Sequence, residues 1–151
     1  MIRARIAAGL AACITLMGTS VSTLAEEMPI KKLMGENFAG LQTILISLIQ
    51  SNYAAVPAHA NAIHEHAVDL TQMAPEGPSA DRQTFLSYAY NLATHARDIK
   101  SISEVLIAHD KDRDKAALGT DQLREALAAH YGGMVEMCVA CHNRFRRTVI
   151  Q

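Results

Sequence analysis

The chain has 151 residues, of which 50% are hydrophobic and only 5% aromatic, with no Trp. We expect one domain with a modest core of Ala, Leu, Ile and Met, a composition that suits helices better than sheets. The formal net charge of −1 gives no indication of the strongly basic surfaces that bind nucleic acid or anionic membranes.

Residues 1–25 have the pattern of a secretory signal peptide. Arg3 and Arg5 precede an apolar stretch that ends near Met17, and Thr23-Leu24-Ala25 offers a small-residue cleavage site. The apolar stretch is too short for a stable membrane span. We therefore expect export to the periplasm and a mature domain of residues 26–151.

The leader leaves one alternative open. Leu10-Ala11-Ala12-Cys13 loosely fits a lipoprotein cleavage box, although apolar sequence continues past Cys13.

After cleavage at residue 25 the chain loses two Arg, so the mature chain has 12 basic and 15 acidic residues and a net charge of about −3. Such a mild charge gives no reason to expect nucleic acid as a partner.

Apolar residues at helical spacing predict four helices, and no alternating pattern predicts a strand. The first helix follows Pro29 and ends near Ser51-Asn52, with the inward stripe Ile30, Met34, Phe38, Leu41, Leu45 and Leu48. The second starts near Pro57 and ends before Pro75, with Ala60, Ile63, Ala67, Leu70 and Met73 inward.

The third predicted helix is capped by Ser79 or Asp81 and carries the stripe Phe85, Ala89, Leu92, Ala96, Ile99, Ile102 and Leu106. A charged turn over 109–115 separates it from the fourth helix, which is capped by Thr120 or begins near Asp114. Its stripe is Leu123, Leu127, His130, Met134, Cys138, Cys141 and Phe145. Four helices with short connections favour an all-α, antiparallel up-down-up-down bundle.

The last predicted helix carries Cys138-Val139-Ala140-Cys141-His142, the Cys-x-x-Cys-His pattern that attaches c-type haem. Each thiol adds to one haem vinyl group, and the adjacent imidazole becomes an axial ligand of the iron. Positions i, i+3 and i+4 share one helix face, so all three side chains can meet one porphyrin. The sequence therefore predicts one covalent haem near one end of the bundle.

Met34 is the first candidate for the sixth iron ligand. In an antiparallel bundle the start of helix one and the end of helix four lie at the same end. Met34 would stand roughly 7–8 Å from that end and His142 roughly 10 Å, at 1.5 Å per residue. The same reasoning places Leu70, Met73, Phe85 and Tyr88 in the pocket walls, which makes Met73 the second candidate. Met134 and Met137 share the helix of His142 and do not readily reach the opposite haem face.

Five further histidines are expected to be structural. We expect His59, His64 and His66 of the second helix at surface or half-buried positions. We expect His95 and His130 to be satisfied histidines nearer the middle of the bundle.

The run from Cys138 to Arg146 contains every fixed position of the pattern Cys-x-x-Cys-His-x-x-Phe-Arg. It resembles that of the cytochromes c-prime and their low-spin relatives, which are exported four-helix proteins and often homodimers. Lys31-Lys32-Leu33-Met34 resembles the Lys-Leu-Met element that carries the distal ligand of low-spin members. The resemblance implies His142 as proximal ligand, Met34 as distal ligand, and Phe145 beside the haem. Arg146 is then either a cation near a haem propionate or a solvated charge, as we expect for Arg144.

Together these features predict a periplasmic electron-transfer protein that exchanges electrons with redox partner proteins and is not an enzyme. One alternative is a five-coordinate cytochrome that binds NO or CO, which requires Met34 to be absent from the iron or easily displaced. A second alternative is a thiol oxidoreductase that uses Cys138 and Cys141. Such motifs usually follow a strand, and no strand is predicted here.

Overall fold

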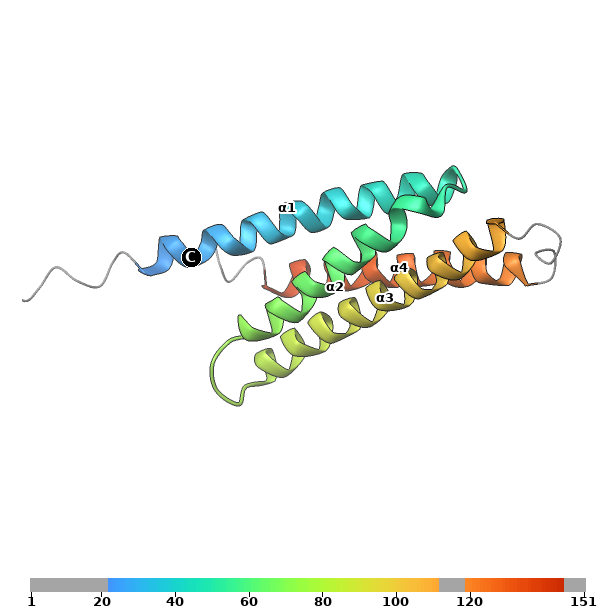
Figure 1. Ribbon diagram of the computed structural model, residues 1–151. Coiled ribbons are helices and arrows are strands. Elements are labelled where there is room, and N and C mark those ends of the chain that lie inside the picture. Colours follow the sequence, from blue (N-terminus) through green and yellow to red (C-terminus); the bar gives the residue numbers. More distant parts are fainter. Residues whose placement is uncertain (1–21, 112–118, 146–151) are drawn as a thin grey trace, which may run out of the picture. The chain divides into compact units, whose positions relative to one another are not determined.

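The protein is all-helical over the residues that the computed structural model describes, 22–111 and 119–145 (Figure 1). No strand occurs in these ranges, which is consistent with a helical bundle. The elements are α1 (Ser22–Ile49), the short 3-10 helix η1 (Tyr53–Ala55), α2 (Val56–Gln72), α3 (Ala80–Lys111) and α4 (Thr120–Phe145).

The chain divides into two compact units, Met1–Lys32 and Leu33–Gln151. Helix α1 runs from the first unit into the second. The core, the cavity and the side-chain contacts considered below all belong to the second unit.

Helix α1 begins before Pro29, where the sequence predicted its start. The residues from Thr23 to Met28 include good helix formers, so the helix extends past Pro29 despite the backbone hydrogen bond that this proline cannot donate. The predicted signal cleavage point after Ala25 lies within this helix, and residues 1–21 lie outside the described part of the chain. The helix ends at Ile49, close to the predicted end, and Ser51 then takes a positive φ of 52°.

The borders of α2 and α3 agree with the turn residues in the sequence. Pro57 occupies the first turn of α2, where its missing N–H costs no hydrogen bond. Between the helices Gly77 adopts a φ of 81°, a left-handed conformation that glycine takes without strain. The backbone N–H of Arg82 donates to Ser79 Oγ at 3.1 Å, so Ser79 caps α3 as predicted.

Helix α4 begins one residue beyond a glycine with φ of 101°. Gly119 occupies the capping position, and its carbonyl accepts from the N–H of Leu123 at 3.1 Å. Thr120 is therefore the first helical residue instead of the predicted cap. Helix α3 extends into the predicted charged turn as far as Lys111, and residues 112–118 lie outside the described part of the chain.

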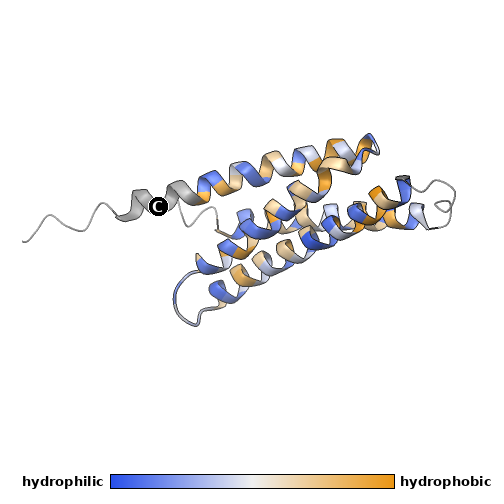
Figure 2. Ribbon diagram, viewed as in Figure 1, coloured by the Kyte–Doolittle hydropathy of each residue, from blue (hydrophilic) through white to orange (hydrophobic). Residues whose placement is uncertain are grey.

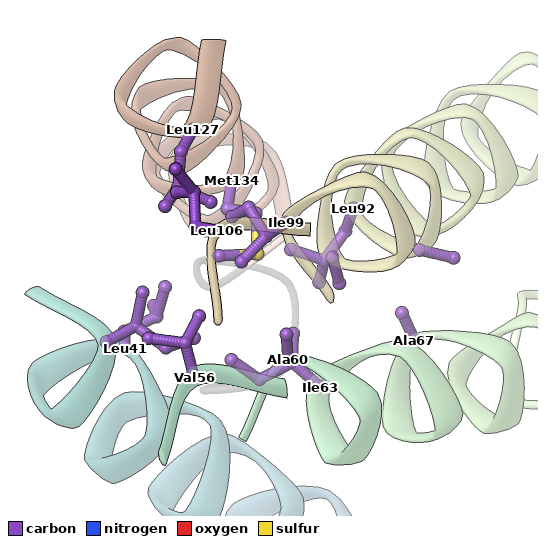
Figure 3. Close-up of a cluster of buried hydrophobic side chains, with 13 residues drawn as sticks. Leu41, Val56, Ala60, Ile63, Ala67, Leu92, Ile99, Leu106, Leu127 and Met134 are labelled. Atoms are coloured by element: carbon purple, nitrogen blue, oxygen red, sulfur yellow. The ribbon is translucent and has the colours of Figure 1, made fainter. Parts of the chain in front are cut away.

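Aliphatic side chains from all four helices form the core of the second unit. Figure 3 shows them pointing toward one another, with Leu41 of α1 and Ile63 of α2 facing Leu92 of α3 and Leu127 of α4. The side chains that are at most 1% exposed include Ile44, Val56, Ala60, Ile63, Ala67, Ala96, Ile99, Leu127 and Met134. The predicted inward stripes of the second, third and fourth helices agree with this core except at Met73, which is 38% exposed.

The predicted inward face of helix α1 is partly wrong. Leu45 is 41% exposed, whereas the neighbouring Ile44 is fully buried. Phe38 is 62% exposed, although it lines the cavity described below. Asn37 and Ser47 are also buried, and Asn37 contacts His66 of α2. The segment from Ile44 to Ile49 is apolar on nearly every side, so its periodicity does not distinguish one face from another.

Several contacts fix how neighbouring helices pair in the second unit. At the start of α3, Asp81 Oδ1 accepts from Arg144 Nη2 near the end of α4 at 2.7 Å. Farther along the same pair of helices, His95 Nδ1 and His130 Nδ1 lie 3.1 Å apart. Between α2 and α3, His64 Nδ1 lies 2.9 Å from the carbonyl oxygen of Ala93.

Polar residues interrupt the apolar stretches of each helix (Figure 2). Within the described residues, none of the helices combines the length and the apolar character that a membrane span requires.

Candidate haem site

One apolar cavity lies between the four helices of the second unit. Its empty volume is about 650 Å³, part of which is open to solvent. The lining residues are Met34, Asn37, Phe38, Leu41, Leu70, Phe85, Tyr88, Ala89, Leu92, Met137, Cys138, Cys141 and His142.

Helix α4 brings the three residues of the Cys-x-x-Cys-His pattern to this cavity. Cys138, Cys141 and His142 lie at positions i, i+3 and i+4 of one helix, and all three line the same space. Both thiols are free and half-buried, whereas His142 is exposed. The helix thus presents two sulfur atoms and one imidazole to a single apolar cavity.

Burial also sets the protonation of the two thiols. Burial raises the pKa of the Cys138 thiol above its usual value. Burial, together with the nearby charge of a Cys138 thiolate, raises the pKa of Cys141 in the same way. Both cysteines are therefore protonated at neutral pH and are poor nucleophiles in the absence of a partner group.

Helix α1 supplies a thioether to the same cavity. Met34 is half-buried and lines the space, as do Asn37 and Phe38 on the next turn. The sequence placed Met34 and His142 at the same level of the bundle, and the two residues line one cavity from different helices.

Aromatic rings form another part of the wall. Phe85 and Tyr88 of α3 line the cavity. Phe145 of α4 packs edge-on against both rings, with centroid distances of 5.4 Å to Phe85 and 6.4 Å to Tyr88. Phe145 is not among the lining residues, so its contact with the cavity passes through its aromatic neighbours.

Met73 does not belong to this site. The sequence made it the second candidate ligand, but it is 38% exposed and is absent from the cavity lining. It follows the last residue of α2, where the helix ends and its predicted inward stripe no longer applies. Leu70, one turn earlier, is buried and lines the cavity as expected.

Of the two arginines considered in the sequence analysis, Arg144 and Arg146, the structure describes only Arg144. Arg144 is exposed as expected and donates to Asp81 of α3, and this hydrogen bond raises the pKa of the guanidinium. Arg146, the other half of the predicted Phe-Arg pair, lies outside the described residues.

The histidines that the sequence predicted to be structural are all half-buried: His59, His64, His66, His95 and His130. His95 and His130 share a close contact between their Nδ1 atoms, and Asp98 Oδ2 lies 3.8 Å from His130 Nδ1. An ideal Cβ on Gly133 would lie 2.6 Å from His95 Cε1, so only a glycine leaves room for this ring. The pair ties α3 to α4 away from the cavity.

Sequence reasoning missed one polar contact at the cavity wall. His66 Nδ1 lies 2.7 Å from Oδ1 of Asn37, which is only 4% exposed. His66 Nε2 in turn lies 3.5 Å from Glu36 Oε2. The polar residue Asn37 within an apolar helix face was the available signal, but helical spacing alone does not pair it with a histidine 29 residues away.

The residues present fit a covalently attached haem. The cavity is apolar and offers two thiols, one imidazole and one thioether, the donor set of a His/Met c-type haem. Cys138 and Cys141 would hold the porphyrin, and His142 and Met34 would bind the iron. Within the described residues, no three side chains of His, Cys, Asp or Glu gather into a metal site. A haem would not need such a cluster, because the porphyrin itself supplies four nitrogen ligands to its iron.

No family model, curated protein or solved structure matches the chain.

Proposed function

We propose that the protein is an exported c-type cytochrome that carries electrons between redox partner proteins. In this proposal residues 1–25 are a signal peptide, and residues 26–151 form an antiparallel four-helix bundle with one haem c. The observation that carries the proposal is the meeting of Cys138, Cys141, His142 and Met34 at one apolar cavity.

The proposed antiparallel order is supported by the contacts between α3 and α4. Asp81 near the start of α3 pairs with Arg144 near the end of α4, whereas His95 and His130 pair at the middle of these helices. Residue numbers therefore rise along one helix as they fall along the other. This order brings the Cys-x-x-Cys-His pattern beside the first turns of α3, including Phe85 and Tyr88.

Each part of the chain has a defined task in this proposal. Cys138 and Cys141 fix the position of the haem, and the apolar walls exclude water from it. His142 and Met34 would both hold the iron, so no ligand would need to enter or leave during electron transfer. The haem supplies an iron that changes its oxidation state by one electron, and a thioether ligand favours the ferrous state relative to a second imidazole.

The alternative with an open sixth position makes the protein a binder of NO or CO. The visible spectrum of the ferrous protein with and without CO distinguishes the two functions. A low-spin spectrum that CO leaves unchanged supports electron transfer. A high-spin spectrum with rapid CO uptake contradicts it and supports gas binding.

A further inference from the structure

Helix α1 leaves a row of large apolar side chains exposed to solvent. Phe38 is 62% exposed, Leu45 is 41% exposed and Ile49 is 75% exposed. They follow one another after seven and four residues, so they lie along one side of the helix. We call this row the outer ridge of α1. It lies beside the side of the helix that Asn37 turns toward His66 of α2.

The outer ridge has the spacing of a seam between two helices. With Gln42, which is also exposed, its residues follow one another at intervals of four, three and four. The a and d positions of a coiled coil have this spacing, and their side chains pack into those of a second helix. A single polar residue in such a seam favours one register of pairing, and Gln42 occupies that place.

No charged residue interrupts this part of the chain. Between Glu36 and Glu65 the sequence contains no Asp, Glu, Lys or Arg. Exposed apolar residues elsewhere differ, since Val68, Val105 and Val135 each adjoin an acidic residue. A single apolar side chain among charges is ordinary on a protein surface, whereas an apolar row without charges indicates a surface that a partner covers.

The absence of charge favours a second copy of the chain as this partner. A two-fold dimer packs the same surface of both copies together, so a charged surface would repel itself and the outer ridge does not. Redox partners meet through small interfaces and are guided by charge, which this part of α1 lacks. Binding to a membrane surface uses Lys and Arg beside the apolar face, and neither occurs here.

We propose that the outer ridge is the interface of a homodimer in which the α1 helices of two copies pack against each other. The ridge reaches the cavity, because Phe38 lines the cavity although most of its side chain is exposed. The second copy would therefore cover the outer side of a residue that forms the cavity wall. This pairing goes beyond the proposed function and does not require that the cavity holds haem.

Sedimentation equilibrium of the purified mature protein tests the dimer. Ile49→Lys should raise the dissociation constant at least about 100-fold, because each dimer would bury two unpaired charges. Val68→Lys is the matched control on α2, four residues after His64, which contacts Ala93 of α3. It should leave the dissociation constant unchanged. A protein that is monomeric at every concentration, or an Ile49→Lys dimer as tight as the unaltered one, would overturn the proposal.

Hydroxyl-radical labelling locates the interface in the unaltered protein and needs no variant. Phe38 and Tyr90 are similarly exposed in the single chain, at 62% and 58%. As rising protein concentration forms the dimer, labelling of Phe38 and Ile49 should fall severalfold, whereas that of Tyr90 on α3 should not change. A dimer in which Phe38 is labelled as fast as in the monomer would overturn the proposal. Both experiments work with or without haem, so a protein that lacks haem contradicts only the proposed function.

Discussion

Met34 of α1 and His142 of α4 line the same apolar cavity, although they come from opposite ends of the described chain. The two side chains carry a nitrogen and a sulfur atom, which the proposed function assigns to the haem iron. Helix α1 begins at Ser22, several residues before its expected start at Pro29. Met34 nevertheless lines the cavity together with His142, so their meeting does not depend on the expected start of α1.

Replacing Met34 should open the sixth coordination position. We expect Met34→Ala to convert a low-spin ferrous spectrum to a high-spin one and to permit CO binding. Met73→Ala is the matched control, because Met73 is exposed and does not line the cavity. A low-spin spectrum in Met34→Ala would show that another residue binds the iron.

Two neighbouring residues of α1 should differ sharply in their contribution to stability. Ile44 is fully buried, so Ile44→Ala should lower the free energy of unfolding by about 2–5 kcal/mol. Leu45 is 41% exposed, and Leu45→Ala should cost less than about 1 kcal/mol. Chemical denaturation measures both, and equal losses would contradict the face of α1 described above.

Adjacent glycines of α4 should respond in opposite directions to alanine. A Cβ at Gly133 would lie 2.6 Å from the His95 ring, which its contact with His130 holds in place. We expect Gly133→Ala to destabilise the protein by about 1–3 kcal/mol. Gly132 has open space around it, so Gly132→Ala should stabilise the helix by up to about 1 kcal/mol. Thermal unfolding tests the pair, and a stabilising Gly133→Ala would contradict the packing of His95.

Burial should slow the alkylation of Cys138 and Cys141 when the protein is made without haem and kept reduced. Because their pKa values are raised, the thiolate fraction at neutral pH is low and grows only at higher pH than for an ordinary cysteine. Alkylation rates across pH measure this. Val139→Cys in a Cys138→Ala/Cys141→Ala background gives an exposed reference thiol on the same turn. Rates equal to that reference would contradict the burial of the pair.

The helices and most of the core could be predicted from spacing and turn residues. Ser79 caps α3 as expected, and the stripe from Ala60 to Leu70 is buried. The error at Leu45 arose because α1 is apolar on several sides from Ile44 to Ile49, so tertiary contacts select the buried face. Met73 was misplaced for a related reason, since α2 ends just before it.

The site could be predicted only in its local part. The spacing of Cys138, Cys141 and His142 places them on one helix face whatever the rest of the chain does. The contact of Asn37 with His66 joins two helices, and it depends on the rotation of α1 about its axis. Helical periodicity did not determine that rotation, so this contact became visible only in the structure.

The mass of the mature protein tests the central claim most directly. Made in a host equipped for cytochrome maturation, the protein should have the mass of the cleaved chain plus one haem, and Cys138→Ala/Cys141→Ala should lose that addition. A colourless product with the mass of the bare chain would contradict covalent haem attachment and the function built on it.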